Sequence, residues 1–158
     1  MKKLLTLILA AGTMLALSCK KEKQINGSNL FIAANIGSVS WLAQPNTSKA
    51  GGDSILVQGI SSTSKNNLSF KIAFNGKGTY QLKKGDATFI YSITPDSPAS
   101  LYQLDTTQNN TVTVTQYDIV SNVTQGTFQL HFVKVQGSSD PGNTINLTNG
   151  RFWLQVPF

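Results

Sequence analysis

The chain of 158 residues contains one cysteine and one histidine, and each scarcity excludes a kind of chemistry. Because Cys19 is the sole thiol, no disulfide can form within the chain, and the hydrophobic core must stabilise the fold. A single histidine, His131, argues against a zinc site and against a catalytic triad, which needs a histidine beside its nucleophile. We therefore predict no catalytic residues, no metal and no cofactor, and place His131 on the solvent side of a strand.

Charged residues are also scarce, at 13% of the chain, and the formal net charge of +6 overstates the basicity of the folded part. From residue 30 onward eight basic side chains oppose six acidic ones, a net charge of +2. The basic residues are scattered and do not form a cluster interleaved with aromatic residues, as a nucleic-acid-binding surface would. No nucleic-acid partner is therefore expected.

Glutamate is missing after residue 22, so a glycoside hydrolase would have to take its usual two carboxylates from six aspartates. Asp86, Asp96, Asp105 and Asp140 lie beside turn-forming residues, where aspartate commonly bonds its own backbone. A hydrolase is therefore the least favoured of the functions considered.

Helical periodicity is limited to the start of the chain, which has the layout of a signal peptide at residues 1–18. A short basic start precedes an apolar run from Leu4 to Leu17 that is short for a bilayer span. The run ends in Ala16-Leu17-Ser18-Cys19, which resembles the lipobox of bacterial lipoproteins. That resemblance implies a lipid on Cys19, which becomes the first residue of the mature protein; a plain secretory signal is the alternative.

The residues that follow Cys19 are polar and include three lysines. We predict that 19–29 are the lipidated cysteine and a flexible tether, and that 30–158 form a single domain. Several acyl chains together anchor a protein stably, and a basic tether suits anionic lipid head groups. The expected location is the outer membrane, on either its periplasmic or its cell-surface face.

Along the predicted domain, apolar and polar side chains alternate with a period of two, which is typical of half-buried strands. Leu68, Phe70, Ile72 and Phe74 show this most clearly, and the segment 126–132 repeats it. Further strands are expected at 31–36, 39–43, 54–61, 79–82, 89–93 and 112–114, with a short edge-like strand at 102–105 and a loop at 45–53. The pattern predicts an all-β antiparallel fold of about nine to ten strands. We favour a β-sandwich, with an up-and-down β-barrel as the alternative because alternation is the same in both.

The end of the chain, 145–156, is predicted to be a hairpin around Asn149-Gly150, since both residues tolerate a positive φ. Phe152, Leu154, Val156 and Phe158 alternate and are expected in the core. Strict alternation then turns Trp153 outward, on the same face as Arg151 and Gln155. We take these three as the candidate ligand-binding residues, because an outward tryptophan can stack on a sugar ring or join a protein contact. The alternative is that a loop or a second sheet covers this face.

Four short motifs together resemble a family of small Bacteroidota lipoproteins known only as a domain of unknown function. They are Ala33 with Gly37 and Trp41, Thr79-Tyr80, Gly126-Thr127-Phe128, and Thr148-Asn149-Gly150-Arg151-Phe152. The resemblance covers nearly the whole predicted domain. It implies that the protein is a lipoprotein located in the cell envelope, and it implies no mechanism.

These observations predict a lipid-anchored, non-enzymatic β-domain that binds a glycan or an envelope protein partner. The alternative is a carrier of a small apolar ligand inside a barrel. A continuous apolar cavity would favour the carrier, whereas a filled core would favour binding at the surface.

Overall fold

The computed structural model describes residues 29–92, 99–138 and 142–158. The predicted signal peptide, Cys19 and all but the last residue of the tether lie outside the described residues, as do Asp96 and Asp140. The described part is built from ten strands: β1 (Phe31–Ile36), β2 (Val39–Lys49), β3 (Ser54–Ile60), β4 (Asn67–Ala73), β5 (Gly78–Gln81), β6 (Ala87–Tyr91), β7 (Ser100–Leu104), β8 (Thr111–Asp118), β9 (Val123–Gln136) and β10 (Thr144–Gln155).

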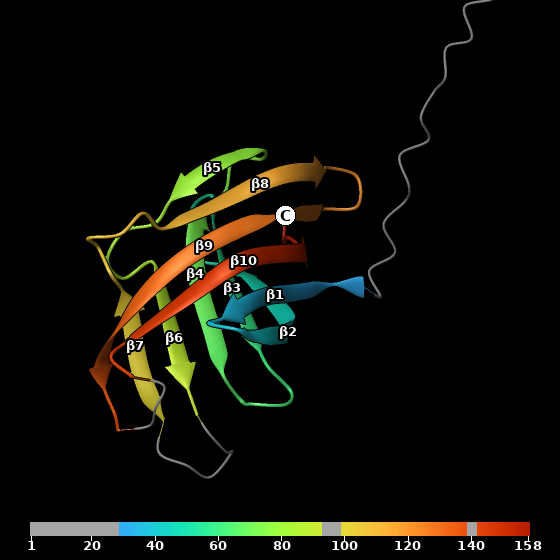
Figure 1. Cartoon of the computed structure of the whole chain (residues 1–158). Coiled ribbons are helices and arrows are strands. Elements are labelled where there is room, and N and C mark those ends of the chain that lie inside the picture. Colours follow the sequence, from blue (N-terminus) through green and yellow to red (C-terminus); the bar gives the residue numbers. More distant parts are fainter. Residues whose placement is uncertain (1–28, 93–98, 139–141) are drawn as a thin grey trace, which may run out of the picture.

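All ten strands belong to one antiparallel sheet, which closes on itself where β10 pairs with both β1 and β9. Eight strands form the closed barrel in chain order, β1, β2, β3, β4, β6, β7, β9 and β10, while β8 and β5 extend the sheet from β9 (Figure 1). The predicted all-β antiparallel fold of nine to ten strands is therefore confirmed. The fold is the β-barrel that we considered as the alternative, and not the favoured β-sandwich, because the strands form one continuous hydrogen-bonded sheet.

Strands β8 and β5 can extend the sheet because β9 is long enough to pair with two strands along one edge. Its second half pairs with β7, from Leu104 opposite Phe132, and its first half pairs with β8, up to Asp118 opposite Val123. Strands β7 and β8 therefore lie end to end beside β9. The prediction of an edge-like strand at 102–105 is wrong, since β7 pairs with β6 on its other side.

The barrel interior is filled by large side chains at alternate positions of the strands. Trp41 packs edge-on against Phe89, with ring centroids 6.0 Å apart, and Phe89 lies 6.0 Å from Phe132. The predicted inward positions are buried: Leu68, Phe70, Ile72, Phe74, Phe128, Leu130, Phe132, Phe152, Leu154 and Val156. Phe158 is the exception at 45% exposed, because β10 ends at Gln155 and the alternation does not continue to the last residue.

Strand β10 corrects the predicted terminal hairpin, because it runs without a reversal through Asn149-Gly150. Leu147 lies opposite Leu130 and Gly150 lies opposite Phe128, so β10 contains one residue more than β9 in this interval. This is a β-bulge, in which Asn149 has a φ of +51°. The positive φ expected of Asn149 is confirmed and that of Gly150 is not. Pairing with β1 and β9 on both sides holds the chain extended.

The predicted loop at 45–53 is also corrected, since β2 continues to Lys49. Pro45 pairs with Gly59 of β3, while β1 pairs with β2 only as far as Ala43. Beyond Ala43 this strand has lost its β1 partner. Proline is tolerated in a strand where one edge lacks a ladder partner, so composition alone misjudged this segment.

Two glycine–phenylalanine pairs explain the motifs at the end of the chain. Gly126 lies opposite Phe152, and Gly150 lies opposite Phe128, on the neighbouring strands β9 and β10. A Cβ placed on Gly126 would lie 2.6 Å from Cζ of Phe152, and one on Gly150 would lie 2.5 Å from Cδ2 of Phe128. Each ring thus occupies the space beside the glycine opposite it. The Gly-x-Phe spacing on both strands is a packing requirement of this pair.

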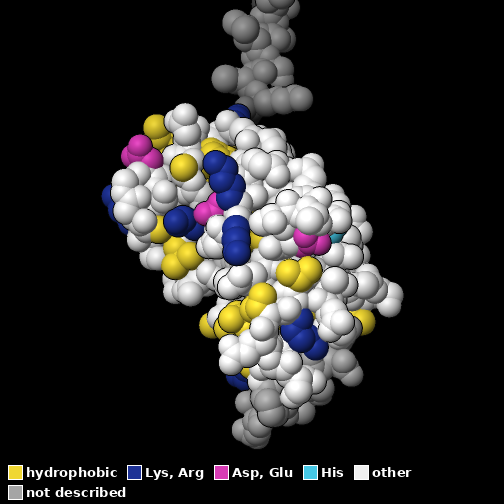
Figure 2. All heavy atoms as spheres, turned by 90° about the vertical axis from the view of Figure 1, so that its left-hand side faces the viewer, with side chains coloured by type: hydrophobic (Ala, Val, Ile, Leu, Met, Phe, Trp, Pro, Cys, Tyr) yellow, Lys and Arg dark blue, Asp and Glu magenta, His cyan; other side chains and the backbone are white. Residues whose placement is uncertain are grey.

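The surface of the barrel carries few charges, and these are dispersed. Figure 2 shows one face, the left-hand side of Figure 1, where Lys and Arg side chains are interspersed with acidic and uncharged ones. Hydrophobic side chains occur there in small separate patches. This face presents neither a uniform basic field nor a single broad apolar one.

A polar hollow on the outer face as the candidate binding site

A row of outward-facing side chains crosses six neighbouring strands at the height of Arg151. The register places these residues side by side, from β2 to β5: Leu42, Ala33, Arg151, Thr127, Thr113 and Thr79. The hydroxyl groups of Thr79 and Thr113 are 3.0 Å apart and hydrogen-bonded. Arg151 stands near the middle of the row and is exposed.

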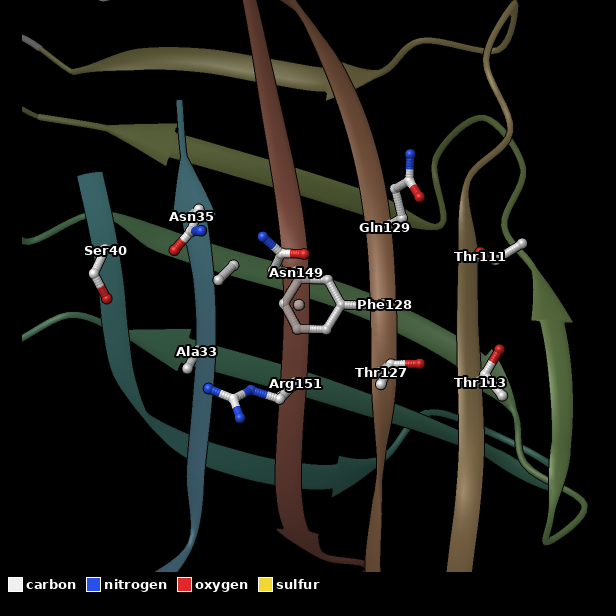
Figure 3. A pocket seen from close by; sticks show the side chains of 12 residues that line it. Ala33, Asn35, Ser40, Thr111, Thr113, Thr127, Phe128, Gln129, Asn149 and Arg151 are labelled. Atoms are coloured by element: carbon white, nitrogen blue, oxygen red, sulfur yellow. The ribbon is translucent and has the colours of Figure 1, made fainter. Parts of the chain in front are cut away.

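A hollow of about 710 Å³ opens on this face beside the β10 bulge. Figure 3 shows the Arg151 side chain extending from β10 toward Ala33 on β1, with the threonines of β9 and β8 on the opposite side. The lining residues are Ala33, Ala34, Asn35, Ser40, Thr111, Thr113, Thr127, Phe128, Gln129, Asn149, Gly150 and Arg151. The hollow is an open depression of the barrel wall, and its lining reaches the buried core residues Ala34 and Phe128.

The lining is dominated by hydroxyl and amide groups, which both donate and accept hydrogen bonds. Among the lining residues that the structure describes, Arg151 is the only charged one. Its guanidinium offers five N–H donors in one plane, whereas the threonines, asparagines and Gln129 offer donors and acceptors around it. Such a surface can bind a ligand with many hydroxyl groups, and it lacks a carboxylate for general acid–base catalysis.

His131 lies on the outer face of β9, two residues beyond Gln129, as the alternation predicted. Its Nδ1 is 2.9 Å from Oδ1 of Asn146, and its Nε2 is 3.2 Å from Nε2 of Gln129. Both ring nitrogens therefore contact amide side chains. This is the environment of a cross-strand surface histidine.

Of the three predicted binding residues, Arg151 lines the hollow and the other two do not. Trp153 is half-buried and Gln155 exposed, both on the outer face of β10, while Phe152 and Leu154 point inward as predicted. Within the described residues, the indole Nε1 of Trp153 is buried without a hydrogen-bond partner. Ligand binding by Arg151, Trp153 and Gln155 stays a prediction.

Three of the four aspartates in the described part bond groups of their own turns. Asp86 accepts a hydrogen bond from the backbone N–H of Lys83, and Asp105 accepts from the N–H and hydroxyl of Thr107. Asp118 organises the link between β8 and β9 in a similar way. Across 29–92, 99–138 and 142–158, no group of three or more His, Cys, Asp or Glu side chains is placed to hold a metal ion.

Asp118 provides a pH-dependent test of this link. Hydrogen bonds from the Ser121 hydroxyl and the Val120 N–H lower the pKa of Asp118 below its ordinary value of 3.8. A lowered folded pKa gives stability that is present above pH 3.8 and is lost as the pH falls through the folded pKa. We expect Asp118→Asn to melt below the wild type at pH 6, with the gap narrowing as the pH falls below 3.8. A gap that persisted in acid would mean that the charge is not the cause.

The polar lining outside β10 was not singled out from the sequence. Thr111, Thr113, Thr127 and Gln129 were recognisable only as the solvent-facing positions of separate strands. They come together because β8 pairs with β9 and β9 with β10, with the bulge setting Asn149 and Gly150 at their centre. The alternating threonines of β8 were the available signal, but strand neighbours are not encoded in that pattern.

Comparison with known families decides the classification. A family model described as "Domain of unknown function (DUF6252)" matches residues 28–157. The chain belongs to the DUF6252 family. The match includes all ten strands, so the barrel and its two extra strands are the structure of a DUF6252 domain. The resemblance to an uncharacterised family is thereby confirmed.

No curated protein sequence and no solved structure matches the chain. In the described part of this DUF6252 protein, helices of the length and apolarity needed to cross a membrane are missing. The function of this DUF6252 domain is therefore inferred from the geometry of its outer face, since no characterised relative is available for comparison.

Proposed function

We propose that this protein is a lipid-anchored domain of the outer membrane that binds a glycan, without catalysis, in the hollow around Arg151. The observation that carries the proposal is the lining itself, in which one arginine is surrounded by hydroxyl and amide groups from five adjacent strands. Sugars present several hydroxyl groups at fixed spacing, which such a surface can match with hydrogen bonds. An envelope protein partner is the second candidate for this outer face.

The compartment in this proposal rests on the sequence. The lipobox-like Ala16-Leu17-Ser18-Cys19 and the basic residues after it support a lipid on Cys19. The likeness to Bacteroidota lipoproteins supports the same location. The domain would then stand on a short tether at the membrane, with its outer wall available to ligands.

The carrier alternative is less well supported, because the barrel interior is occupied. Tyr102, Phe70, Phe89 and Phe132 are among its largest fully buried side chains. A carrier needs a continuous apolar space with an open mouth, and the hollow beside Arg151 is polar and lies on the outer wall. A filled interior favours binding at the surface.

Thermal melting of residues 28–158 against a panel of glycans, with fatty acids for comparison, tests the proposal. A ligand at one hundred times its dissociation constant stabilises a domain by about 2.7 kcal/mol, which raises the melting temperature by several degrees. We expect such a shift with one glycan class. A shift with fatty acids alone would support the carrier, and no shift with any glycan would favour a protein partner.

Arg151→Ala should weaken glycan binding on the order of ten- to a hundredfold, since a hydrogen bond to a charged group contributes about 1.5–3 kcal/mol. Titration calorimetry with the glycan identified by melting measures the change. Lys84→Ala is the matched control, because Lys84 is an exposed cation outside the hollow. Equal affinity in both variants would place the site elsewhere.

A further inference from the structure

The two most exposed large hydrophobic side chains of the described part are consecutive residues. Ile119 is 75% exposed and Val120 is 90% exposed, and they occupy the link between β8 and β9. Single exposed hydrophobic residues are normal on protein surfaces. Two adjacent ones at the tip of a hairpin form a small apolar patch that protrudes from the surface.

This link is held in a defined shape by its own hydrogen bonds. The Asp118 carboxylate accepts from the Val120 N–H at 2.9 Å and from the Ser121 hydroxyl at 2.6 Å. Asn122 has a φ of +53°, and its carbonyl accepts from the N–H of Val156 at 2.7 Å. Asp118 thus bonds groups of its own link, and Asn122 ties the link to the residue after β10. The two apolar side chains are presented outward by a fixed loop.

The chain enters the barrel at this same end. Phe31, the first residue of β1, lies opposite Trp153, which lies opposite Gln125, which in turn lies opposite Gln116 of β8. Figure 1 shows the start of β1 and the β8–β9 link on the same side of the molecule. With neighbouring strands about 4.8 Å apart, the row from β1 to β8 spans only about 15 Å.

The length of chain before β1 sets how far this end can lie from a lipid on Cys19. Nine residues lie between Cys19 and Asn29, so ten Cα–Cα steps join them. Ten such steps reach at most about 35 Å. A lipid on Cys19 would therefore keep the β8–β9 link close to the bilayer surface.

We propose that the barrel rests on the lipid surface by this end, with Ile119 and Val120 inserted among the lipid chains. This inference deepens the proposed lipid anchor and rests on it. Lys49, the last residue of β2, and Lys77, in the link between β4 and β5, are exposed at the same end, and so is Asp53. The charge of this end is therefore mixed, and the apolar pair carries the contact with lipid. The insertion orients the barrel, so that the outer wall with the Arg151 hollow stands roughly upright from the membrane.

A fluorescent probe on the full lipidated chain, reconstituted in vesicles containing anionic lipid, tests the insertion. Acylation consumes the thiol of Cys19, so a cysteine introduced by Val120→Cys is the single reactive thiol for an environment-sensitive dye. We expect blue-shifted emission that is quenched by nitroxides on the lipid chains and protected from a water-soluble quencher. Ser38→Cys, in the exposed β1–β2 turn at the other end, is the matched control and should stay accessible to water.

Flotation of the same samples separates the two proposals. Vesicle-bound protein whose residue-120 probe resembles the Ser38→Cys control would overturn the insertion while leaving the lipid anchor intact. A residue-120 probe protected from water but untouched by lipid nitroxides would assign this end to a contact with a second copy of the chain, which also overturns the insertion. Protein that does not float with vesicles would contradict the anchor itself, and the insertion with it.

Discussion

Phe128→Ala and Phe152→Ala are each expected to lower the free energy of unfolding by about 3–5 kcal/mol, as large-to-small changes in a core do. The side chains are 4% and 2% exposed, and each ring packs beside the glycine of the neighbouring strand. No other side chain is in place to fill the space, because Gly150 and Gly126 have none. Truncation therefore leaves a cavity at the seam between β9 and β10, the pairing that helps to close the barrel.

Urea unfolding of residues 28–158 measures the loss, since the midpoint falls in proportion to stability when the slope is unchanged. Phe158→Ala is the matched control: it removes the same side chain from a position that is 45% exposed. We expect a clearly smaller loss there. Near-wild-type stability of either core variant would show that the faces of β9 and β10 are reversed.

Cys19→Ala is expected to move the protein from the membrane fraction to the soluble fraction almost completely. Each buried methylene of an acyl chain contributes roughly 0.8 kcal/mol to membrane binding, so several chains dominate over any contact of the domain. Fractionation of cells expressing each form measures the shift. Mass spectrometry of the wild-type N-terminal peptide should show the lipid on Cys19.

A second variant guards against retention by the apolar run at 4–17. In it, a cleavable secretory signal replaces residues 1–19, so that both the thiol and the run are absent. We expect this chain to be soluble, whereas a substitution that preserves Cys19, such as Lys20→Ala, should stay in the membrane. A chain without Cys19 that remained in membranes would rule out the lipid as the anchor.

The inward positions of the strands could be predicted from the sequence because alternation is a local property. Phe70 on β4 and Phe128 on β9 have polar neighbours on both sides in the chain, and each is buried in the barrel. The conformation of Asn149 was equally local, since asparagine tolerates a positive φ wherever it occurs. Whether this positive φ gave a turn or a bulge depended on the strands that pair with β10. With β1 and β9 paired along it, a bulge kept the strand in the sheet where an isolated segment would have reversed.

The hollow around Arg151 combines local and long-range determinants in the same way. Arg151 and its outward direction followed from the spacing of Phe152 and Leu154, so one candidate residue was available from the sequence. Its companions come from strands up to 118 residues away in the chain, as with Ala33 opposite Arg151. Hydrogen-bonded pairing between the two ends of the chain closes the barrel and assembles that face. The sequence by itself determined most of the strands and their buried sides, because those depend on neighbouring residues, while the lipid anchor stays a prediction. Only the tertiary structure decided closure and the composition of the hollow, because strand register depends on contacts between distant parts of the chain.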